Sequence, residues 1–510
     1  MVCLVLCWKQ YSGICKQRIK LTEKVIIEAL TFDDVLLVPA HSEVLPREVD
    51  LKSKITRNLT LSLPLVSAAM DTVTGADMAI QMAKLGGIGI LHRNQSIDEQ
   101  GTEVDKVKRA ESTIIKDPVT IESSRTVGDT LQLIKSKDIS GFPVVEDGQI
   151  RGIVTYRDLW NVEDKSIVIS EVMTSGEDLI TAPYNTSFEE ALKILADNRI
   201  EKLPLVDNSN NLKGLLTVKD IEKSRRFPNA SKDSQGRLRV GAAIGVAKDS
   251  MERAERLINS QIDVLVIDSA HGHSKGVMDL LKRVKKSYPE QEVVAGNVVT
   301  KEGTEDLINH GADAVKVGIG PGASCTTRVV TGVGMPQLTA IMNCQKAAKK
   351  MNVPIIADGG IRFSGDIAKA LAAGASTVMM GSVLAGMEES PGEMILLDGR
   401  WFKNYRGMGS IGAMQSGGSD RYFQEDEEKA KLAPEGIEGR VPYRGSVRES
   451  IHQFVGGIRA AMGYCGAPNI ASLQKNAQFA KITLSGMKES HPHDLIISRE
   501  APNYQSHGQV

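Results

Sequence analysis

A glycine-rich stretch, "GIGPGASCTTR" at residues 318–328, places one cysteine, Cys325, directly behind three glycines and a proline. Glycine lets backbone amides approach a ligand closely, because no Cβ stands in the way. A thiol in such a loop can act as a catalytic nucleophile, but free cysteine is also common as inert packing in a core. The loop alone leaves both roles open, so the elements that position Cys325 have to decide between them.

Eight short aliphatic runs recur along the chain between helical segments. Continuous apolar runs that alternate with helices indicate buried parallel strands, and eight is the number of strands in a (β/α)₈ barrel. We therefore predict an α/β fold of this kind, a TIM barrel, with an open doubly wound sheet as the alternative. The runs cover residues 63–68, 86–91, 239–245, 263–268, 292–296, 313–318, 353–358 and 376–381.

Polar residues gather where the last five of these predicted strands end. Asp268 and Asn297 follow two of the runs, the loop of Cys325 follows the next, and Asp358 and the pair 381–382 follow the last two. The C-terminal strand ends of such barrels carry the active site. This position favours a chemical role for Cys325 over a packing role.

The loops after the last two predicted strands are typical of a phosphate site. Glycine amides in these loops can point at an anion, and Asp358 just before them could accept hydrogen bonds from ribose hydroxyls. The same glycines could instead serve only tight turns. The pattern predicts a phosphorylated sugar derivative, such as a nucleotide, held by Gly359, Gly360, Gly381 and Ser382.

An internal repeat interrupts the barrel pattern after its second predicted helix: residues 126–159 match residues 187–221. The two copies resemble a tandem pair of CBS domains, a Bateman module, whose cleft commonly binds adenine or guanine nucleotides. Asp158 and Asp220 would then contact ribose hydroxyls, although their Thr-x-x-Asp setting also fits a helix-capping box. We expect CBS domains at 111–171 and 172–231, inserted into a barrel formed by 25–110 and 232–510.

The composition is that of a soluble globular protein with two or three domains: 510 residues, 41% apolar, 25% charged and a net charge of −1. There is no basic excess for non-specific nucleic-acid binding, no apolar stretch long enough for a membrane span and no signal-peptide pattern. The six cysteines form no CxxC pair, which favours a reduced, cytoplasmic setting. Residues 1–24 are expected to be a poorly ordered extension, with a misassigned start as the alternative.

Over nearly its whole length the chain resembles the family of inosine-5′-monophosphate (IMP) dehydrogenase and GMP reductase, in its bacterial form with tandem CBS domains. The motifs are "SAAMDTVT", "GIGPGxxCTTR", "GVGMPQ", "DGGIRFSGDI", "YRGMGS", "RYFQ" and "EGIEGRVPYRG". The resemblance implies a (β/α)₈ barrel with an inserted CBS pair. It also implies NAD-dependent oxidation of IMP to xanthosine monophosphate (XMP), the committed step of guanine nucleotide synthesis.

The resemblance also implies a division of catalytic labour. Cys325 would attack C2 of the hypoxanthine ring, and hydride transfer to NAD would leave a thioimidate that water hydrolyses. Arg421 and Tyr422, on a flap of about 386–440, would activate the water, with Thr327 and Glu435 as a second proton route. An arginine base is chemically unexpected, because guanidinium has a pKa above about 12.

By the same resemblance, NAD would face Asp268, Asn297, Gly318, Ile319 and Gly320. A potassium ion would be held by the carbonyls of Gly320, Gly322 and Cys325 and by Glu489, Ser490 and His491 of a neighbouring subunit, which implies a homotetramer and leaves an octamer open. IMP would contact Asp358, Gly359, Gly360, Gly381, Ser382, Tyr405, Arg406, Gly407, Met408, Gly409 and Glu435.

One departure from the family pattern precedes the cysteine. The family usually has serine and then an apolar residue there, whereas this chain has Ala323 and Ser324, which leaves weaker IMP binding open. Two other functions stay as alternatives. GMP reductase shares the cysteine loop but is shorter and usually lacks the CBS pair and the flap; a non-enzymatic nucleotide sensor would need none of the catalytic residues.

Overall fold

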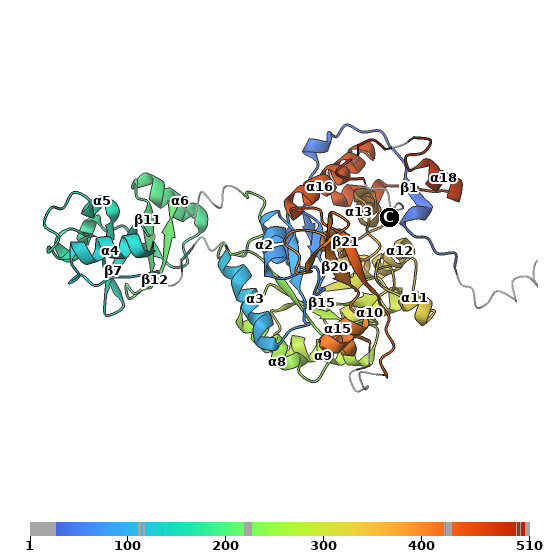
Figure 1. The fold of residues 1–510 in the computed structure, drawn as a ribbon, viewed down its shortest axis with the longest axis horizontal. Helices are drawn as coiled ribbons and strands as arrows, with labels where there is room; N and C mark the ends of the chain where they lie inside the picture. Colours follow the sequence, from blue (N-terminus) through green and yellow to red (C-terminus); the bar gives the residue numbers. More distant parts are fainter. Residues whose placement is uncertain are drawn as a thin grey trace, which may run out of the picture.

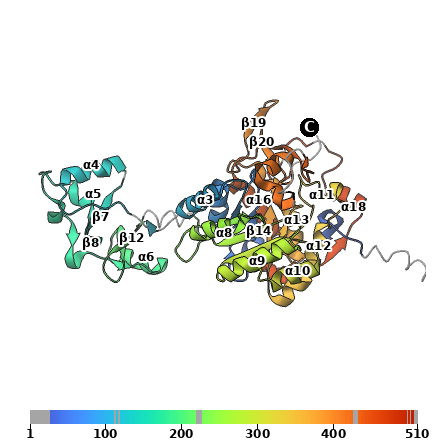
Figure 2. The ribbon, with the colours of Figure 1, turned by 90° about the horizontal axis from the view of Figure 1, so that it is seen from below.

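The computed structural model describes residues 27–504 except 111–113, 116–117, 138, 219–226, 423, 425–430, 496 and 500. The expected extension at 1–24 lies outside the described residues. Figure 1 shows a large body that contains most of the chain and a smaller one, coloured cyan to green, beside it. Figure 2 shows the same separation after a quarter turn.

The large body is built on a closed barrel of eight parallel strands, each at one of the predicted aliphatic runs. This confirms the (β/α)₈ barrel and excludes the open sheet. The strand order around the barrel is β13-β14-β15-β16-β17-β18-β4-β5. The strands are β4 (Leu65–Ser67), β5 (Ile88–Leu91), β13 (Gly241–Ile244), β14 (Val264–Asp268), β15 (Glu292–Val298), β16 (Ala314–Val317), β17 (Ile355–Asp358) and β18 (Thr377–Met380).

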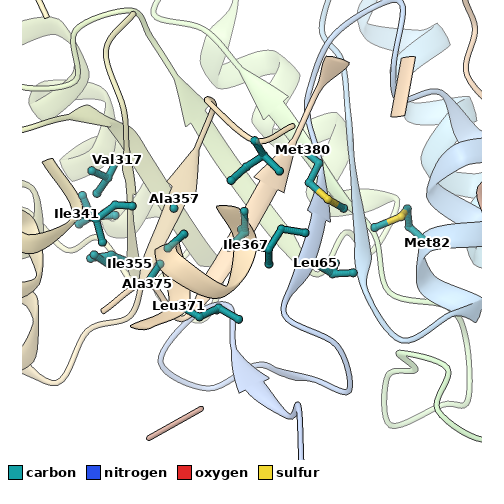
Figure 3. Close-up of a cluster of buried hydrophobic side chains, with 14 of the residues drawn as sticks. Leu65, Met82, Val317, Ile341, Ile355, Ala357, Ile367, Leu371, Ala375 and Met380 are labelled. Carbon is teal, nitrogen blue, oxygen red and sulfur yellow. The ribbon is translucent and has the colours of Figure 1, made fainter. Parts of the chain in front are cut away.

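Both faces of the barrel strands are buried, which explains their continuous apolar sequence. Along β14, Val264 and Val266 belong to the cluster that fills the barrel, whereas Leu265 and Ile267 belong to the cluster under the helices. Figure 3 shows the outer cluster, where Ile341 lies close to β16 and β17. The helices around the barrel are α2 (Ala76–Lys84), α3 (Ile97–Ala110), α8 (Ser250–Asn259), α9 (Lys275–Ser287), α10 (Lys301–Asn309), α12 (Gln337–Ala348), α13 (Ser364–Ala372) and α16 (Val447–Tyr464).

The smaller body is the internal repeat, and each copy has its own apolar cluster. The two hairpins are equivalent: Pro143 pairs with Ile153 in the first, and Pro204 pairs with Leu215 in the second. The first copy contains α4 (Val127–Lys137), β7 (Gly141–Glu146), β8 (Gln149–Thr155), α5 (Tyr156–Leu159) and β9 (Thr174–Ser175). The second contains β10 (Ala182–Pro183), α6 (Phe188–Asp197), β11 (Lys202–Val206) and β12 (Leu212–Thr217).

The insert closes on itself, because β6 (Ile114–Ile115), which precedes the first copy, pairs with β12 of the second. Its two ends therefore lie side by side. In chain order the insert leaves the barrel after α3 and the barrel resumes at β13.

Much of the expected flap is regular structure. An antiparallel sheet of β19 (Met394–Leu397), β20 (Arg400–Arg406) and β21 (Glu438–Pro442) projects from the barrel (Figure 2), and short helical turns α15 (Ile411–Ala413), η6 (Met414–Gly418) and η7 (Ser419–Tyr422) lie between β20 and β21 in the chain. We refer to residues 417–422 as the strap. No helix in the described part of the chain is long and apolar enough to cross a membrane.

Smaller elements complete the large body. The hairpin of β2 (Ser53–Lys54) and β3 (Thr60–Leu61) contributes Leu61, which packs with Ile55 in the cluster inside the barrel. The others are η1 (Phe32–Asp34), β1 (Val35–Leu37), η2 (Pro46–Glu48), α11 (Thr327–Val330), η5 (Lys349–Met351), α14 (Ser382–Ala385), α17 (Ile470–Asn476), β22 (Phe479–Lys481) and α18 (Leu484–Glu489).

Candidate active site

A cavity of about 130 Å³ lies at the C-terminal ends of the barrel strands, the end where barrels of this type carry their active sites. It brings together residues that are far apart in the sequence, such as Asp268 and Glu435. The predicted site residues that line it are Asp268, Asn297, Gly318, Gly320, Gly322, Cys325, Asp358, Gly359, Gly360, Gly381, Ser382, Tyr405, Gly407, Met408, Gly409, Arg421, Tyr422 and Glu435.

Cys325 is half-buried and faces this cavity, not the core. Its thiol donates a hydrogen bond to the Thr327 hydroxyl, with 3.1 Å between Sγ and Oγ1. A backbone hydrogen bond also joins the loop of Cys325 to the part of the flap that precedes β21. In it, the Thr326 amide donates to the Glu435 carbonyl at 2.9 Å. By contrast, Cys344 is buried in the core, and burial raises its pKa to about 12. Cys325 is therefore the better-placed nucleophile.

A buried lysine that the sequence analysis missed links three predicted site residues. Lys316 lies on β16 with its side chain only 2% exposed. Its Nζ lies 2.8 Å from Asp268 Oδ1 and 2.6 Å from Asp358 Oδ2, and it also donates to Asn297 Oδ1. A buried charge needs such partners. The sequence does contain a signal for this buried lysine, because Lys316 is a charged residue within the otherwise apolar run "AVKV".

The turn after β17 requires glycine. Gly359 and Gly360 have φ angles of +94° and +80°, which side chains other than glycine rarely adopt. A Cβ at Gly359 would also lie 2.8 Å from Pro321 Cγ. The backbone of these loops can thus come close to a ligand at the cavity wall, as a phosphate site needs.

Ser324, at the departure from the family pattern, lies at the site. It is buried and lines the cavity together with Ala323. Burial raises the pKa of Tyr405, while a side-chain hydrogen bond with Ser324 opposes the rise. The serine is shifted by one position in sequence, but its hydroxyl is still part of the cavity.

Arg421 and Tyr422, at the end of the strap, reach into the same cavity. The Arg421 guanidinium pairs with Asp268, and the Ala270 amide donates to the Arg421 carbonyl at 3.1 Å. Burial lowers the pKa of Arg421, and the positive charge of Arg93 acts in the same direction, whereas Tyr422 opposes it. Burial raises the pKa of Tyr422. Burial and Arg93 thus favour a neutral guanidine, whereas the ion pair with Asp268 favours the charged form.

Several predicted residues lie outside this cavity. The Arg406 side chain pairs with Asp71, with Nη2 and Oδ2 2.6 Å apart, and the Ile319 carbonyl accepts a hydrogen bond from Arg328. Glu489 is the last residue of α18, and Ser490 and His491 follow it; His491 packs near Phe363. Their expected contact is with a neighbouring subunit, so it stays a prediction.

The loop of Cys325 offers oxygen ligands that suit a monovalent cation. Among the described residues, none donates a hydrogen bond to the carbonyls of Gly320 or Cys325, whereas the Gly322 carbonyl accepts one from the Cys325 amide at 3.1 Å. The described residues contain no cluster of three or more His, Cys, Asp or Glu side chains that could hold a metal. The potassium site therefore stays a prediction.

The insert has a separate cavity of about 540 Å³ that Asp158 lines together with Tyr156 and Trp160. Asp158 Oδ2 accepts hydrogen bonds from the Thr155 amide at 2.7 Å and from its hydroxyl at 2.8 Å. The capping role is thus present, and nucleotide binding stays a prediction. Asp220 lies outside the described residues.

A barrel mouth that holds a loop thiol beside carboxylates and glycine-lined turns defines a (β/α)₈-barrel enzyme of nucleotide-like substrates. Residues 29–493 match the model of the IMP dehydrogenase / GMP reductase domain. The chain belongs to the IMP dehydrogenase / GMP reductase family, as the motifs predicted.

The similar proteins include both IMP dehydrogenases and a GMP reductase. The chain is 57% identical over 478 residues to the inosine-5′-monophosphate dehydrogenase of Halalkalibacterium halodurans and 56% identical over 480 residues to that of Bacillus subtilis. Each match covers 94% of this chain and 98% of the relative. The crystal structure of a cysteine-to-alanine variant of GMP reductase from Trypanosoma brucei, in complex with guanosine 5′-monophosphate, matches with a TM-score of 0.79 and 40% identity, over 93% of this chain and 99% of that one.

This last match corrects one argument from the sequence. A GMP reductase that covers 93% of this chain must also match part of the insert. Length and the presence of the insert therefore do not separate the two activities. The choice between the two activities rests on the residues of the flap and on the higher sequence identity to IMP dehydrogenases.

Proposed function

We propose that the chain oxidises IMP to XMP with NAD as the hydride acceptor. The observation that supports this best is the meeting of two sets of residues in one cavity: Cys325 on the barrel loop, and Arg421, Tyr422 and Glu435 on the flap. A cysteine adduct alone would serve either activity of the family, whereas a water-activating set is needed only for hydrolysis. The identity of 54–57% to several IMP dehydrogenases supports the same choice.

The nucleotide would lie along the loops after β17 and β18. Asp358 can accept hydrogen bonds from the ribose, and Lys316 keeps its carboxylate in place. The backbone at Gly359, Gly360, Gly381 and Ser382 would hold the phosphate, with Ser324 and Tyr405 also lining the cavity. Arg406 would contribute only its backbone, because Asp71 holds its side chain.

In the first half of the reaction Cys325 acts as a thiolate nucleophile. The thiol loses its proton to solvent to form this thiolate, and the Thr327 hydroxyl, 3.1 Å away, can then donate a hydrogen bond to the sulfur. The sulfur forms a bond to C2 of the base while a ring electron pair moves to the adjacent nitrogen. When that pair returns, hydride leaves C2 and a thioimidate remains on Cys325. The oxidised nicotinamide of NAD supplies the acceptor for this hydride.

In the second half water adds to C2 and gives up a proton, and the C2–S bond then breaks to return the Cys325 thiolate. Arg421 is placed to take that proton in its neutral form, which burial and Arg93 make more accessible by lowering its pKa. Tyr422 lies beside it, and Glu435 with Thr327 gives the second route. The oxygen of the water becomes the new carbonyl of XMP.

The two halves of the reaction need the Asp268 carboxylate for different partners: the cofactor in the first half and Arg421 in the second. Asp268 lines the cavity with Asn297, Gly318 and Gly320, and it is suited to the ribose of the cofactor. In the described structure its Oδ2 pairs with Arg421. Cofactor binding at Asp268 therefore requires Arg421 to leave, and water activation requires it to return.

A potassium ion and a homotetramer complete the proposal. The carbonyls of Gly320, Gly322 and Cys325 would hold the ion from one subunit, and Glu489, Ser490 and His491 of a neighbouring subunit would complete its shell. The ion would stabilise the conformation of the cysteine loop. An octamer of two such tetramers stays open.

The direct experiment is to incubate the protein with IMP, NAD and K⁺ and to follow NADH by absorbance. NADH formation together with XMP supports the proposal. Oxidation of NADPH in the presence of GMP, without NADH formation from IMP, would instead identify a GMP reductase. Nucleotide binding without either reaction would identify a sensor.

Deletion of residues 111–231 should leave an active barrel that no longer responds to purine nucleotides. The proposed CBS domains, 111–171 and 172–231, have their own apolar clusters and adjacent ends, so their removal spares the barrel core. Initial rates with and without ATP and GTP, for the full chain and the deletion, test this. A folded deletion variant without turnover would contradict the regulatory assignment.

A further inference from the structure

A buried ion pair fastens the strap to the barrel. Arg93, in the loop after β5, pairs through Nη2 with Oδ1 of Asp420 on the strap. The two side chains are only 8% and 4% exposed. The pair joins residues 327 positions apart. The effect of Arg93 on the pKa of Arg421 needs only the arginine, so it does not explain the pairing with Asp420.

Two further contacts fix the geometry of this pair. Arg93 Nη1 donates to the Gly417 carbonyl at 3.3 Å, and the Val246 amide after β13 donates to Asp420 Oδ2 at 3.3 Å. A Cβ at Gly245 would overlap the Asp420 carboxylate and would lie 2.8 Å from Arg93 Nη1. The pair therefore occupies a fitted place between the ends of β5 and β13, which are neighbours in the barrel.

The next residue of the strap is Arg421, which occupies the carboxylate of Asp268. Because the two residues are adjacent in the chain, we expect the ion pair and this contact to form and break together. The state with both contacts made excludes a cofactor from Asp268, and the state with both broken admits it.

We propose that Arg93 and Asp420 are positioning residues that latch the strap closed and so set how much of the time the cofactor site is blocked. This inference rests on the proposed function of the cavity. A ligand binds more weakly in proportion to the fraction of protein that is competent to bind it. A strong latch thus weakens the apparent affinity for NAD and, in exchange, keeps Arg421 in place for water attack.

The latch lies away from the nucleophile. Cys325 follows β16, whereas the latch is at the ends of β5 and β13, on another part of the barrel rim. Variants of the latch should therefore spare thiolate attack and hydride transfer. Asp420→Asn should act on the partition between the open and closed strap, whereas Arg93→Met also removes a charge that lowers the pKa of Arg421.

The first test uses the ligand-free protein. In Asp420→Asn and in Arg93→Met, one buried charge loses its partner, which strongly disfavours the closed state. Amides of residues 411–422 should exchange hydrogen roughly 10- to 100-fold faster, as measured by mass spectrometry. Gly245→Ala keeps both charges but displaces the carboxylate, and it should give the same change.

Lys108→Met is the matched control. Lys108 and Asp263 also form a buried ion pair, 2.6 Å apart, but Asp263 precedes β14 and so lies at the other end of the barrel. This variant should cost stability without faster exchange in 411–422. Equal acceleration in the control would mean that global destabilisation, not the latch, causes the effect.

The second test separates the two halves of catalysis. The latch variants should lower the KM for NAD and lower kcat by roughly tenfold, with an unchanged burst of NADH. In the variant with both substitutions, the effects should be less than the product of the single effects, because the two residues act as a pair. A KM for NAD that stays constant or rises would overturn the latch, as would unaltered exchange of the strap.

If the unmodified protein makes no NADH from IMP, the proposed function fails, but the exchange test of the latch still stands.

Discussion

Cys325→Ser is expected to abolish NADH formation, with a loss of at least roughly 10³-fold in turnover. Oxygen in serine is a far poorer nucleophile than a thiolate near neutral pH, and Thr327, the hydrogen-bond partner of Cys325, offers a hydroxyl and not a base. IMP binding should be largely unchanged, because the proposed phosphate and ribose contacts come from the loops after β17 and β18. Steady-state absorbance and titration calorimetry with IMP measure the two quantities.

Cys344→Ser is the matched control for this substitution. The Cys344 thiol is buried under the helices, and burial raises its pKa to about 12. Its replacement removes a thiol without touching the cavity and should keep turnover. Substantial NADH formation by the Cys325 variant would contradict a covalent mechanism.

Arg421→Ala is expected to lower steady-state turnover by about 10² to 10⁴, the range for loss of a general base. A single burst of NADH should remain, because thiolate attack and hydride transfer do not need the guanidinium. A nucleotide adduct on Cys325 should then accumulate and appear in intact-protein mass spectrometry. Addition of Glu435→Gln should lower the residual turnover further, since the second proton route is lost.

The pH dependence gives a separate check on this base. Only the neutral guanidine can accept a proton, so its active fraction rises with pH toward a pKa that burial and Arg93 lower. Turnover limited by hydrolysis should therefore rise with pH in the alkaline range, and Arg421→Ala should flatten the rise. Arg400→Ala, an exposed arginine on β20 of the same flap, should change neither quantity. Loss of the burst itself would place Arg421 before hydrolysis.

The barrel was predictable from the sequence because its strands are buried on both faces. Val264 and Val266 fill the interior while Leu265 and Ile267 meet the helices, so β14 has no polar alternation and reads as a continuous apolar run. The positions of Asp268, Asn297 and Asp358 followed from the rule that parallel strands end together.

The contacts between loops were not predictable in this way. Arg93 and Asp420 lie in irregular segments 327 residues apart, where no periodicity indicates which side chains face each other. Lys316 could have been noticed as a charge in a buried strand, but its three partners come from three other strands and depend on barrel closure. The side chain of Arg406 is taken by Asp71, a pairing that the motif "YRGMGS" does not encode.

The place where the insert joins the barrel has a consequence for how such proteins can change over generations. The insert occupies the connection from helix α3 to strand β13, and helix-to-strand connections lie at the end of the barrel opposite to the catalytic loops. Because β6 and β12 bring its two ends together, a recombination event can remove, add or replace this module without moving a catalytic side chain. The same connection is therefore a natural graft point, at which an engineered enzyme could receive a sensor for an unrelated metabolite.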